Sequence, residues 1–345
     1  MTNRRLFWLL VRVGVSVALL VLLLARLDIP SMARFIARAD WWLAALTLVT
    51  VVMDRCLMAG RWIYLLEGLG IHASRLKVVK IFLVSTFFGS FLPTGIGGEA
   101  IRAVSFSRLS SKGVESVASV AMDRIMGMLS MLLTGLAALL VSYRIYPHPV
   151  LLATVLSLSL IAVAGLVSLL SPSVHRLLLY RIRPAGRLAG ESSGWRASVE
   201  RAMGAMESYR SQPGLMGLVL AMSVAVQVLR ILQAYLLSEA MALGSPLVYF
   251  FCFVPLILLI TMLPISVSGL GTTNLAYVAL FGSVGMDPDG AFVLSVLILA
   301  LGVIGNLPGG VIYALEGFAA SESAPGKGNA RHGDLERSSL VESDR

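Results

Sequence analysis

The sequence predicts an all-α integral membrane protein, a polytopic helix bundle with two inverted re-entrant hairpins made of broken helices. Three observations predict this class. Of the 345 residues, 57% are hydrophobic and only 14% are charged, whereas soluble domains carry about 25% charged residues. Apolar runs long enough to cross roughly 30 Å of hydrocarbon recur along the chain. Two other apolar runs are interrupted by proline and glycine.

One membrane domain is expected over residues 1–320, followed by a polar, disordered cytoplasmic tail over residues 321–345. The first apolar run follows two arginines and lacks a small-residue cleavage site, so we expect a retained helix rather than a signal peptide. Full spans are expected at 6–25, 41–65, 114–141, 150–170, 214–238 and 291–317, and the re-entrant hairpins at 81–107 and 248–283.

The second span begins with Trp41 and Trp42, at the position where an aromatic belt is expected at the membrane interface. Within this span, Asp54 and Arg61 are seven residues apart and therefore share one helix face. Because both lie outside the broken segments, we expect a structural pair there.

The first broken run is interrupted by Pro93. From Ile81 the run reaches this proline after only 12 residues, too few to span roughly 30 Å of hydrocarbon. Pro93 removes a backbone donor, and Gly97 and Gly98 loosen the chain that follows. A second short piece ends in the basic loop 108–112, so we expect this hairpin to enter from the cytoplasm.

The central spans carry charge into the membrane. The span 114–141 contains Asp123 and Arg124 near its start, and the span 214–238 contains Arg230 deep inside it. Between the spans 150–170 and 214–238 lies the loop 171–213, with seven arginines against three glutamates. The positive-inside rule places this loop in the cytoplasm, where we expect it to meet anionic lipid headgroups.

The second broken run repeats the first in altered form, with Pro264 followed by Gly269, Gly271 and Asn274. By this topology its hairpin enters from the outside, so the two units are inverted copies. Inverted repeats with paired broken segments are typical of transporters whose site lies between the repeats. The alternative is that both are ordinary proline-kinked helices, whose freed backbone groups neighbouring helices satisfy.

The same charge bias predicts a multi-pass protein of the cytoplasmic membrane, with the amino terminus and the carboxyl tail both cytoplasmic. Nucleic acid is not an expected partner, because the basic residues are scattered over loops. All four histidines fall in predicted loops or tails, so we predict no metal site and no cofactor.

Residues 92–102, the pair Asp123-Arg124 and the turn 263–271 resemble recurrent motifs of one family. They are similar to motifs in the transmembrane flippase region of lysylphosphatidylglycerol synthases and their stand-alone relatives, and the resemblance covers roughly residues 10–317. The family turn commonly ends in a glutamate, where this sequence has Asn274. Bifunctional members add a soluble aminoacyl-transferase domain. Without one here, the resemblance implies lipid translocation or handling of a lipid-linked group, and no enzyme activity is expected.

An anionic headgroup crossing the membrane needs cations and backbone donors near the midplane. Gly97 and Gly98 would open a half-helix whose free N–H groups suit a phosphate, and arginines would add charge-assisted hydrogen bonds. Alternatively, Glu99 with Arg102, and Asp123 with Arg124, are structural ion pairs that hold a re-entrant loop. The candidate substrate-binding residues are Pro93, Gly97, Gly98, Glu99, Arg102, Asp123, Arg124, Arg230, Pro264, Gly269, Gly271 and Asn274.

The leading hypothesis is a flippase-like translocase for an anionic phospholipid or a polyprenyl-phosphate-linked lipid. The first alternative is a membrane-embedded enzyme, or a partner subunit of one, acting on a lipid-linked phosphate with Glu99 and Asp123 as its only candidate carboxylate pair. The second alternative is a small-solute secondary transporter, which needs a closed aqueous cavity rather than a groove open to the bilayer.

Overall fold

The computed structural model describes residues 35, 37, 39–92, 97–110, 112–143, 149–169, 171, 193–262 and 269–322. Within these ranges the regular elements are all α-helices. The expected first span, nearly all of the expected tail and the first part of the loop 171–213 lie outside the described residues. Both proline turns, 93–96 and 263–268, also lie outside them.

Four helices of the described part are long and apolar enough to cross a membrane. They are α3 (Trp41–Gly68), α6 (Gly113–Ser142), α10 (Pro213–Ala240) and the first 28 residues of α13 (Pro288–Glu322). Helix α7 (Pro149–Leu169) contains a shorter apolar stretch. The prediction of an all-α, multi-pass membrane fold is therefore confirmed.

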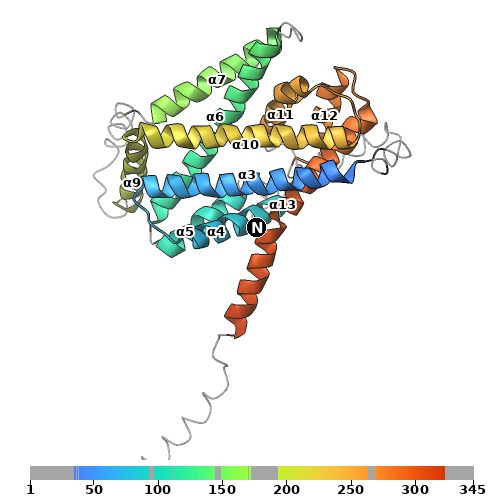
Figure 1. Cartoon of the computed structure of the whole chain (residues 1–345). Helices are drawn as coiled ribbons and strands as arrows, with labels where there is room; N and C mark the ends of the chain where they lie inside the picture. Colours follow the sequence, from blue (N-terminus) through green and yellow to red (C-terminus); the bar gives the residue numbers. More distant parts are fainter. Residues whose placement is uncertain are drawn as a thin grey trace, which may run out of the picture.

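Helices α3 and α10 form an antiparallel pair and lie side by side across the molecule (Figure 1). At one end, the Asp40 N–H donates to the Ala240 carbonyl at 2.8 Å. At the other end, the Tyr209 hydroxyl donates to the Leu65 carbonyl at 2.9 Å. Tyr209 belongs to α9 (Ser193–Arg210), which packs at this end of the pair. This end is called the α9 end.

The first broken segment folds as a helical hairpin of α4 (Arg75–Phe91) and α5 (Gly97–Ser110). Helix α4 begins six residues before the expected start of this hairpin at Ile81. Its basic first turn is continuous with an apolar face, because Val78 and Phe82 are four residues apart and both are buried. The basic residues at the start of α4 therefore lie on the polar side of a helix and not in a loop before it.

The two helices of this hairpin approach each other closely at Gly89 and Gly98. A Cβ atom on Gly98 would lie 2.7 Å from the Ser85 carbonyl oxygen and 2.9 Å from the Gly89 Cα atom. Because both neighbours are backbone atoms, only glycine fits this contact without moving α4 away from α5.

The second broken segment forms a hairpin of α11 (Leu247–Met262) and α12 (Thr272–Gly282), and α11 continues through Pro255. The two hairpins open at opposite ends of the α3–α10 pair. Near the opening of the first, the Lys112 ammonium donates to the Gly70 carbonyl at the α9 end. Beside the second, Gly290 of α13 packs against Leu243, close to the end of α10.

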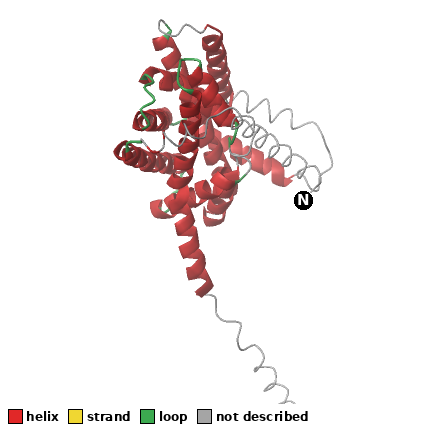
Figure 2. Ribbon diagram, turned by 90° about the vertical axis from the view of Figure 1, so that its right-hand side faces the viewer, coloured by secondary structure: helices red, strands yellow, loops and turns green. Residues whose placement is uncertain are grey.

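The hydrophobic core has a separate cluster around each hairpin. One cluster includes Trp62, Phe82 and Phe106 beside α4 and α5, and another includes Phe250 and Phe281 beside α11 and α12. Figure 2 shows the helices packed together and the carboxyl-terminal part of α13 projecting beyond them. Described residues of both hairpins line one cavity, and polar residues gather in its wall.

Candidate functional site

A cavity of about 570 Å³ is lined by described residues from both hairpins. Ser90 near the end of α4 and Glu99 at the start of α5 line it from the first hairpin. Thr261 near the end of α11 and Gly269 just before α12 line it from the second. Helices α3, α6, α10 and α13 complete the wall.

The wall of this cavity carries more arginines than carboxylates. The charged lining residues are Arg55, Arg61, Arg102, Arg124, Arg230, Asp54, Glu99 and Asp123. Among the described residues of the wall, five guanidinium groups against three carboxylates leave a formal surplus of two positive charges. Because charges interact more strongly in a low-dielectric interior than in water, this surplus favours an anionic ligand.

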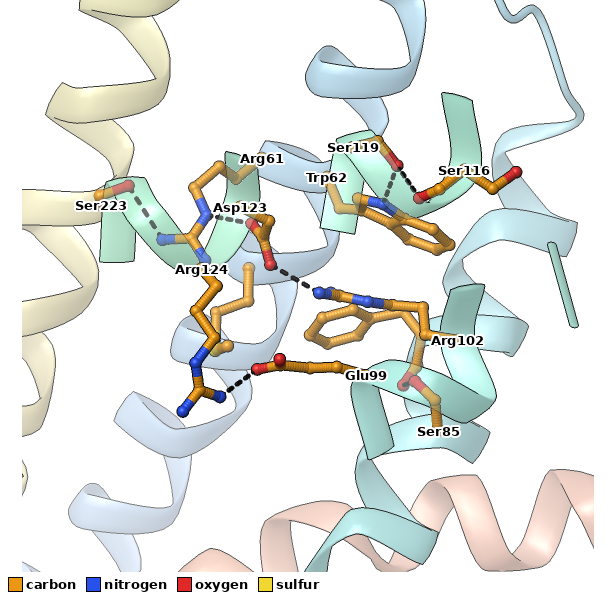
Figure 3. Close-up of polar contacts among 12 residues, drawn as sticks. Arg61, Trp62, Ser85, Glu99, Arg102, Ser116, Ser119, Asp123, Arg124 and Ser223 are labelled. Carbon is orange, nitrogen blue, oxygen red and sulfur yellow. Dashed lines mark hydrogen bonds and ion pairs between the residues drawn. The ribbon is translucent and has the colours of Figure 1, made fainter. Parts of the chain in front are cut away.

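Three deeply buried charges form a triad around Asp123 (Figure 3). Arg61 Nε lies 2.7 Å from one carboxylate oxygen of Asp123, and Arg102 Nη2 lies 2.9 Å from the other. The three side chains are only 4–5% exposed. Arg61 also donates to the Ser223 hydroxyl of α10 at 2.9 Å. The triad therefore ties α3, α5, α6 and α10 together.

Aromatic rings enclose the Arg102 guanidinium. It lies 4.9 Å from the ring centroid of Trp62 and 5.5 Å from that of Phe82. The Trp62 indole N–H donates to the Ser119 hydroxyl at 3.2 Å, which fixes the orientation of its ring. A cation over an aromatic face is stabilised by the ring quadrupole, most strongly where water is excluded.

A second cluster lies between α3 and α10. Asp54 accepts from Arg55 Nη1 at 2.9 Å and from Arg230 Nε at 3.2 Å, so one carboxylate again serves two arginines. The Met58 sulfur accepts from both guanidinium groups. The Arg55 and Arg230 side chains are 17% and 22% exposed, which makes them more accessible than the Asp123 triad.

A third contact joins the first hairpin to α6, where Arg124 and Glu99 form a salt bridge (Figure 3). Both side chains are about one quarter exposed, and both line the cavity. Arg124 and Asp123 are adjacent on α6, yet they serve different clusters.

The ion pairs that were the structural alternative are therefore wrong in their partners. Asp123 binds Arg102 rather than Arg124, and Glu99 binds Arg124 rather than Arg102. Asp123 and Arg124 are directed to different partners, because successive residues of a helix point about 100° apart and here Asp123 meets Arg61 and Arg102 while Arg124 meets Glu99. The expected pair of Asp54 with Arg61 is also absent from the described contacts, because Asp54 faces α10 and Arg61 faces Asp123.

The structure brings seven of the twelve candidate residues to the cavity wall: Gly98, Glu99, Arg102, Asp123, Arg124, Arg230 and Gly269. Gly97, Gly271 and Asn274 do not line it. Pro93 and Pro264 lie outside the described residues.

Asn274 instead holds the start of α12. Its side-chain oxygen accepts from the Gly271 N–H at 3.0 Å, and its amide donates to the Ser295 hydroxyl at 2.6 Å. Gly271 has a φ of +84°, a conformation that favours glycine. These contacts give Asn274 a capping role at the turn.

Sequence reasoning missed several polar residues of the wall. Arg55, Gln227, Gln233 and Asn306 all line the cavity. On α10, the residues Ser223, Gln227 and Arg230 recur at a helical spacing of four and three within an apolar run. This polar stripe is a signal that could have identified one wall of the cavity.

The family model described as "Lysylphosphatidylglycerol synthase TM region" matches residues 9–309 of the chain. The match includes every residue given above as lining the cavity. A comparison with curated proteins found no match.

Proposed function

The chain belongs to the family of the lysylphosphatidylglycerol synthase TM region, and from this premise we propose that it is a lipid translocase. Its cargo would be an anionic phospholipid or a polyprenyl-phosphate-linked lipid, moved across the cytoplasmic membrane. The family points to a lipid-related membrane function, and the cavity supports the finer assignment.

The observation that carries the proposal is the positive surplus of a cavity lined by residues of both hairpins. An ionised group is costly in hydrocarbon, so charges inside membrane proteins mark substrate pathways or are paired. Here three carboxylates offset only part of the charge of five arginines. A phosphate-bearing headgroup would supply the missing negative charge and accept hydrogen bonds from the guanidinium groups.

The start of α5 adds backbone donors to the same wall. Gly98 and Glu99 belong to the first turn of this helix and line the cavity. The first turn of a helix carries unpaired N–H groups and the positive end of the helix dipole. Broken helices that present such ends to an anionic substrate are a recurrent arrangement in transporters.

The opposite openings of the two hairpins support a transport cycle. We propose that both hairpins are re-entrant, that they form an inverted repeat, and that the α9 end faces the cytoplasm. Movement of one hairpin against the other would then expose the cavity to one side of the membrane at a time. We propose a carrier rather than an enzyme because arginines hold both candidate carboxylates, Glu99 and Asp123.

The test is reconstitution of the full chain into liposomes that contain fluorescent phosphatidylglycerol, fluorescent phosphatidylcholine or a polyprenyl phosphate probe. Probe that reaches the inner leaflet escapes quenching by dithionite, and the protected fraction reports translocation. We expect protein-dependent translocation of the anionic probes, and a severalfold loss in Arg124→Gln, which removes a cation of the cavity wall.

The matched control is Arg75→Gln, because Arg75 forms an exposed ion pair with Glu67 and is absent from the cavity wall. It should translocate like the wild type. A folded wild-type protein that moves none of the probes, with or without an imposed proton or sodium gradient, would contradict the proposed function.

A further inference from the structure

The Asp54 cluster lies outside the first hairpin, on α3 and α10. Its two arginines are more exposed than the two arginines of the Asp123 triad. The Asp123 triad has its two arginines bound to both carboxylate oxygens, and its side chains are almost inaccessible. Arg124 is partly accessible but has Glu99 as its own carboxylate. In the Asp54 cluster two arginines share one carboxylate, and both remain partly exposed to the cavity.

Donor groups around this cluster lack protein acceptors. Among the described residues, Arg55 Nε and Gln233 Nε2 are buried and make no hydrogen bond. Both residues line the cavity together with Arg230. A buried donor without an acceptor is costly, so such groups point to a ligand that supplies one. The surplus charge and the free donors are both satisfied by a phosphate oxygen.

The cluster also lies next to the contact between α3 and α13. Gly305 of α13 packs against Val51 and approaches Arg55, with its nearest Arg55 contact at Nε. Gly302, one turn earlier, lines the cavity and has nothing within 4 Å of its missing Cβ. The open space on this face lies at Gly302, because at Gly305 α3 and α13 are in close contact and a Cβ atom there would lie 2.4 Å from Val51 Cγ1.

The outer surface beside this seam is apolar. Val52 of α3 is 61% exposed, and Ile304 and Leu307 of α13 are each 46% exposed. Exposed apolar side chains on helices of this kind suit contact with the hydrocarbon of a membrane. A lipid whose phosphate lies at Arg55 therefore has a short apolar path for its chains between the two helices.

We propose that Arg55 and Arg230, bridged by Asp54, bind the phosphate of the lipid, and that its hydrocarbon chains leave the cavity between α3 and α13. This inference rests on the proposed function. It assigns headgroup recognition to a cluster outside both hairpins, and it leaves the Asp123 triad as the scaffold that holds α3, α5, α6 and α10 together. Asp54 holds the two guanidinium groups side by side while the cavity is empty.

The experiment uses the full chain in phosphatidylcholine nanodiscs that contain phosphatidylglycerol with a photoactivatable diazirine in its acyl chain. Labelled peptides are identified by mass spectrometry. We expect labelling of wild-type α3 near Val52 and of α13 near Ile304. At subsaturating probe, Arg55→Gln and Arg230→Gln should each lower the labelling roughly tenfold, as expected for loss of a charge-assisted hydrogen bond.

Each single variant leaves Asp54 with one arginine, which limits the damage to the fold. Arg75→Gln is the matched control and should label like the wild type. Gly302→Leu tests the path of the chains separately, because it fills the seam while both arginines remain. We expect it to abolish the labelling of α13.

Normal labelling of both Arg55→Gln and Arg230→Gln would overturn the assignment of the phosphate site. An equal loss in Arg75→Gln would also overturn it, since the effect would then follow overall charge. Competition by inorganic phosphate at the concentration of the probe would show that the site takes free phosphate rather than a lipid headgroup.

Binding and translocation are measured separately. A wild type that is labelled as expected but moves no lipid in liposomes would contradict the proposed function and leave this lipid site in place. A wild type that moves lipid while both variants label normally would contradict this inference alone.

Discussion

Carboxylates are scarce among the charged residues of the cavity. Asp123 and Asp54 each hold two arginines, and only Glu99 has a single partner among the ion pairs described above. Removing Asp123 or Asp54 leaves two arginines without a negative partner. Removing one arginine from either cluster leaves one arginine paired with the carboxylate. The two types of residue therefore differ in what their loss does to stability.

The first prediction concerns Asp123→Asn. It leaves Arg61 and Arg102 buried without a negative partner, and loss of one partner from a buried ion pair typically costs about 3–5 kcal/mol. We expect a similar loss of unfolding free energy, measured as a lower thermal midpoint by circular dichroism in detergent. Adding Arg102→Gln to this variant removes one of the two uncompensated charges and should recover part of the loss.

Glu67→Gln is the control for this prediction. Glu67 pairs with Arg75 at 3.3 Å, and the two side chains are 33% and 75% exposed. Exposed ion pairs contribute at most about 1 kcal/mol, so the midpoint should change little. If Asp123→Asn unfolded at the same temperature as Glu67→Gln, the triad would not be the scaffold described here.

The types of residue at the site could be predicted from sequence, but their partners could not. Glu99, Arg102, Asp123 and Arg124 stand out because charge inside an apolar run is costly unless it has a purpose. Their pairing depends on how α5 and α6 are rotated against each other, which local spacing does not contain. Arg55 was missed for the same reason, since its position beside Arg230 depends on the packing of α3 against α10.

At the scale of elements, the hairpins depend on backbone contacts as well as on side chains. Breaks in an apolar run predicted both helical hairpins from the sequence, because a proline interrupts a helix and each remaining piece is short. The start of α4 was misplaced, because three basic residues in its first two turns resemble a loop. The end of the molecule at which each hairpin opens depends on helix packing. From the sequence, this end could be predicted only with the positive-inside rule.

The second prediction tests the contact between α4 and α5. Gly98→Ala places a Cβ atom 2.7 Å from the Ser85 carbonyl oxygen. Such overpacking typically lowers the free energy of unfolding by about 1–3 kcal/mol. We expect a lower thermal midpoint and slower translocation, because the displaced α5 carries Glu99 and Arg102 with it. The matched control is Gly217→Ala on α10, where nothing lies within 4 Å.

Gly217→Ala should unfold at the same temperature as the wild type or slightly higher, since alanine favours the helix by up to about 1 kcal/mol over glycine. Equal behaviour of the two alanine variants would show that α4 and α5 do not need to approach so closely.

The third prediction separates capping from binding at Asn274. Asn274→Ala removes the acceptor for the Gly271 N–H and the donor to Ser295. Loss of a helix cap costs about 0.5–2 kcal/mol, so the thermal midpoint should fall. Labelling by the photoactivatable phosphatidylglycerol should persist, because Asn274 does not line the cavity. Loss of labelling in a folded variant would instead place Asn274 in the binding site.

At the scale of the whole molecule, α13 links the two hairpins. It begins beside α12 and then packs along α4, where Gly309 allows it to approach the Leu83 carbonyl. The Asn306 amide donates to the Ser90 hydroxyl at 2.7 Å, which joins α13 to the tip of the first hairpin beside the cavity. Phe88 and Tyr313 add an edge-to-face ring contact, with centroids 4.9 Å apart. If the first hairpin moves, α4 must therefore slide along α13.

The last prediction tests whether transport needs that sliding. In a background of Cys56→Ala and Cys252→Ala, the pair Ser90→Cys and Asn306→Cys is joined by a short bifunctional thiol reagent with a reducible bond. We expect the link to stop translocation, and a reductant to restore it, because the tip of α4 can no longer move relative to α13. Photoactivatable phosphatidylglycerol should still label the linked protein, since Arg55 and Arg230 lie outside the hairpin. The two single-cysteine variants, treated with the same reagent, control for modification of either side chain alone. If the linked protein translocated lipid at the rate of its reduced form, the hairpin and α13 would act as one rigid unit, and access to the cavity would have to alternate through the second hairpin.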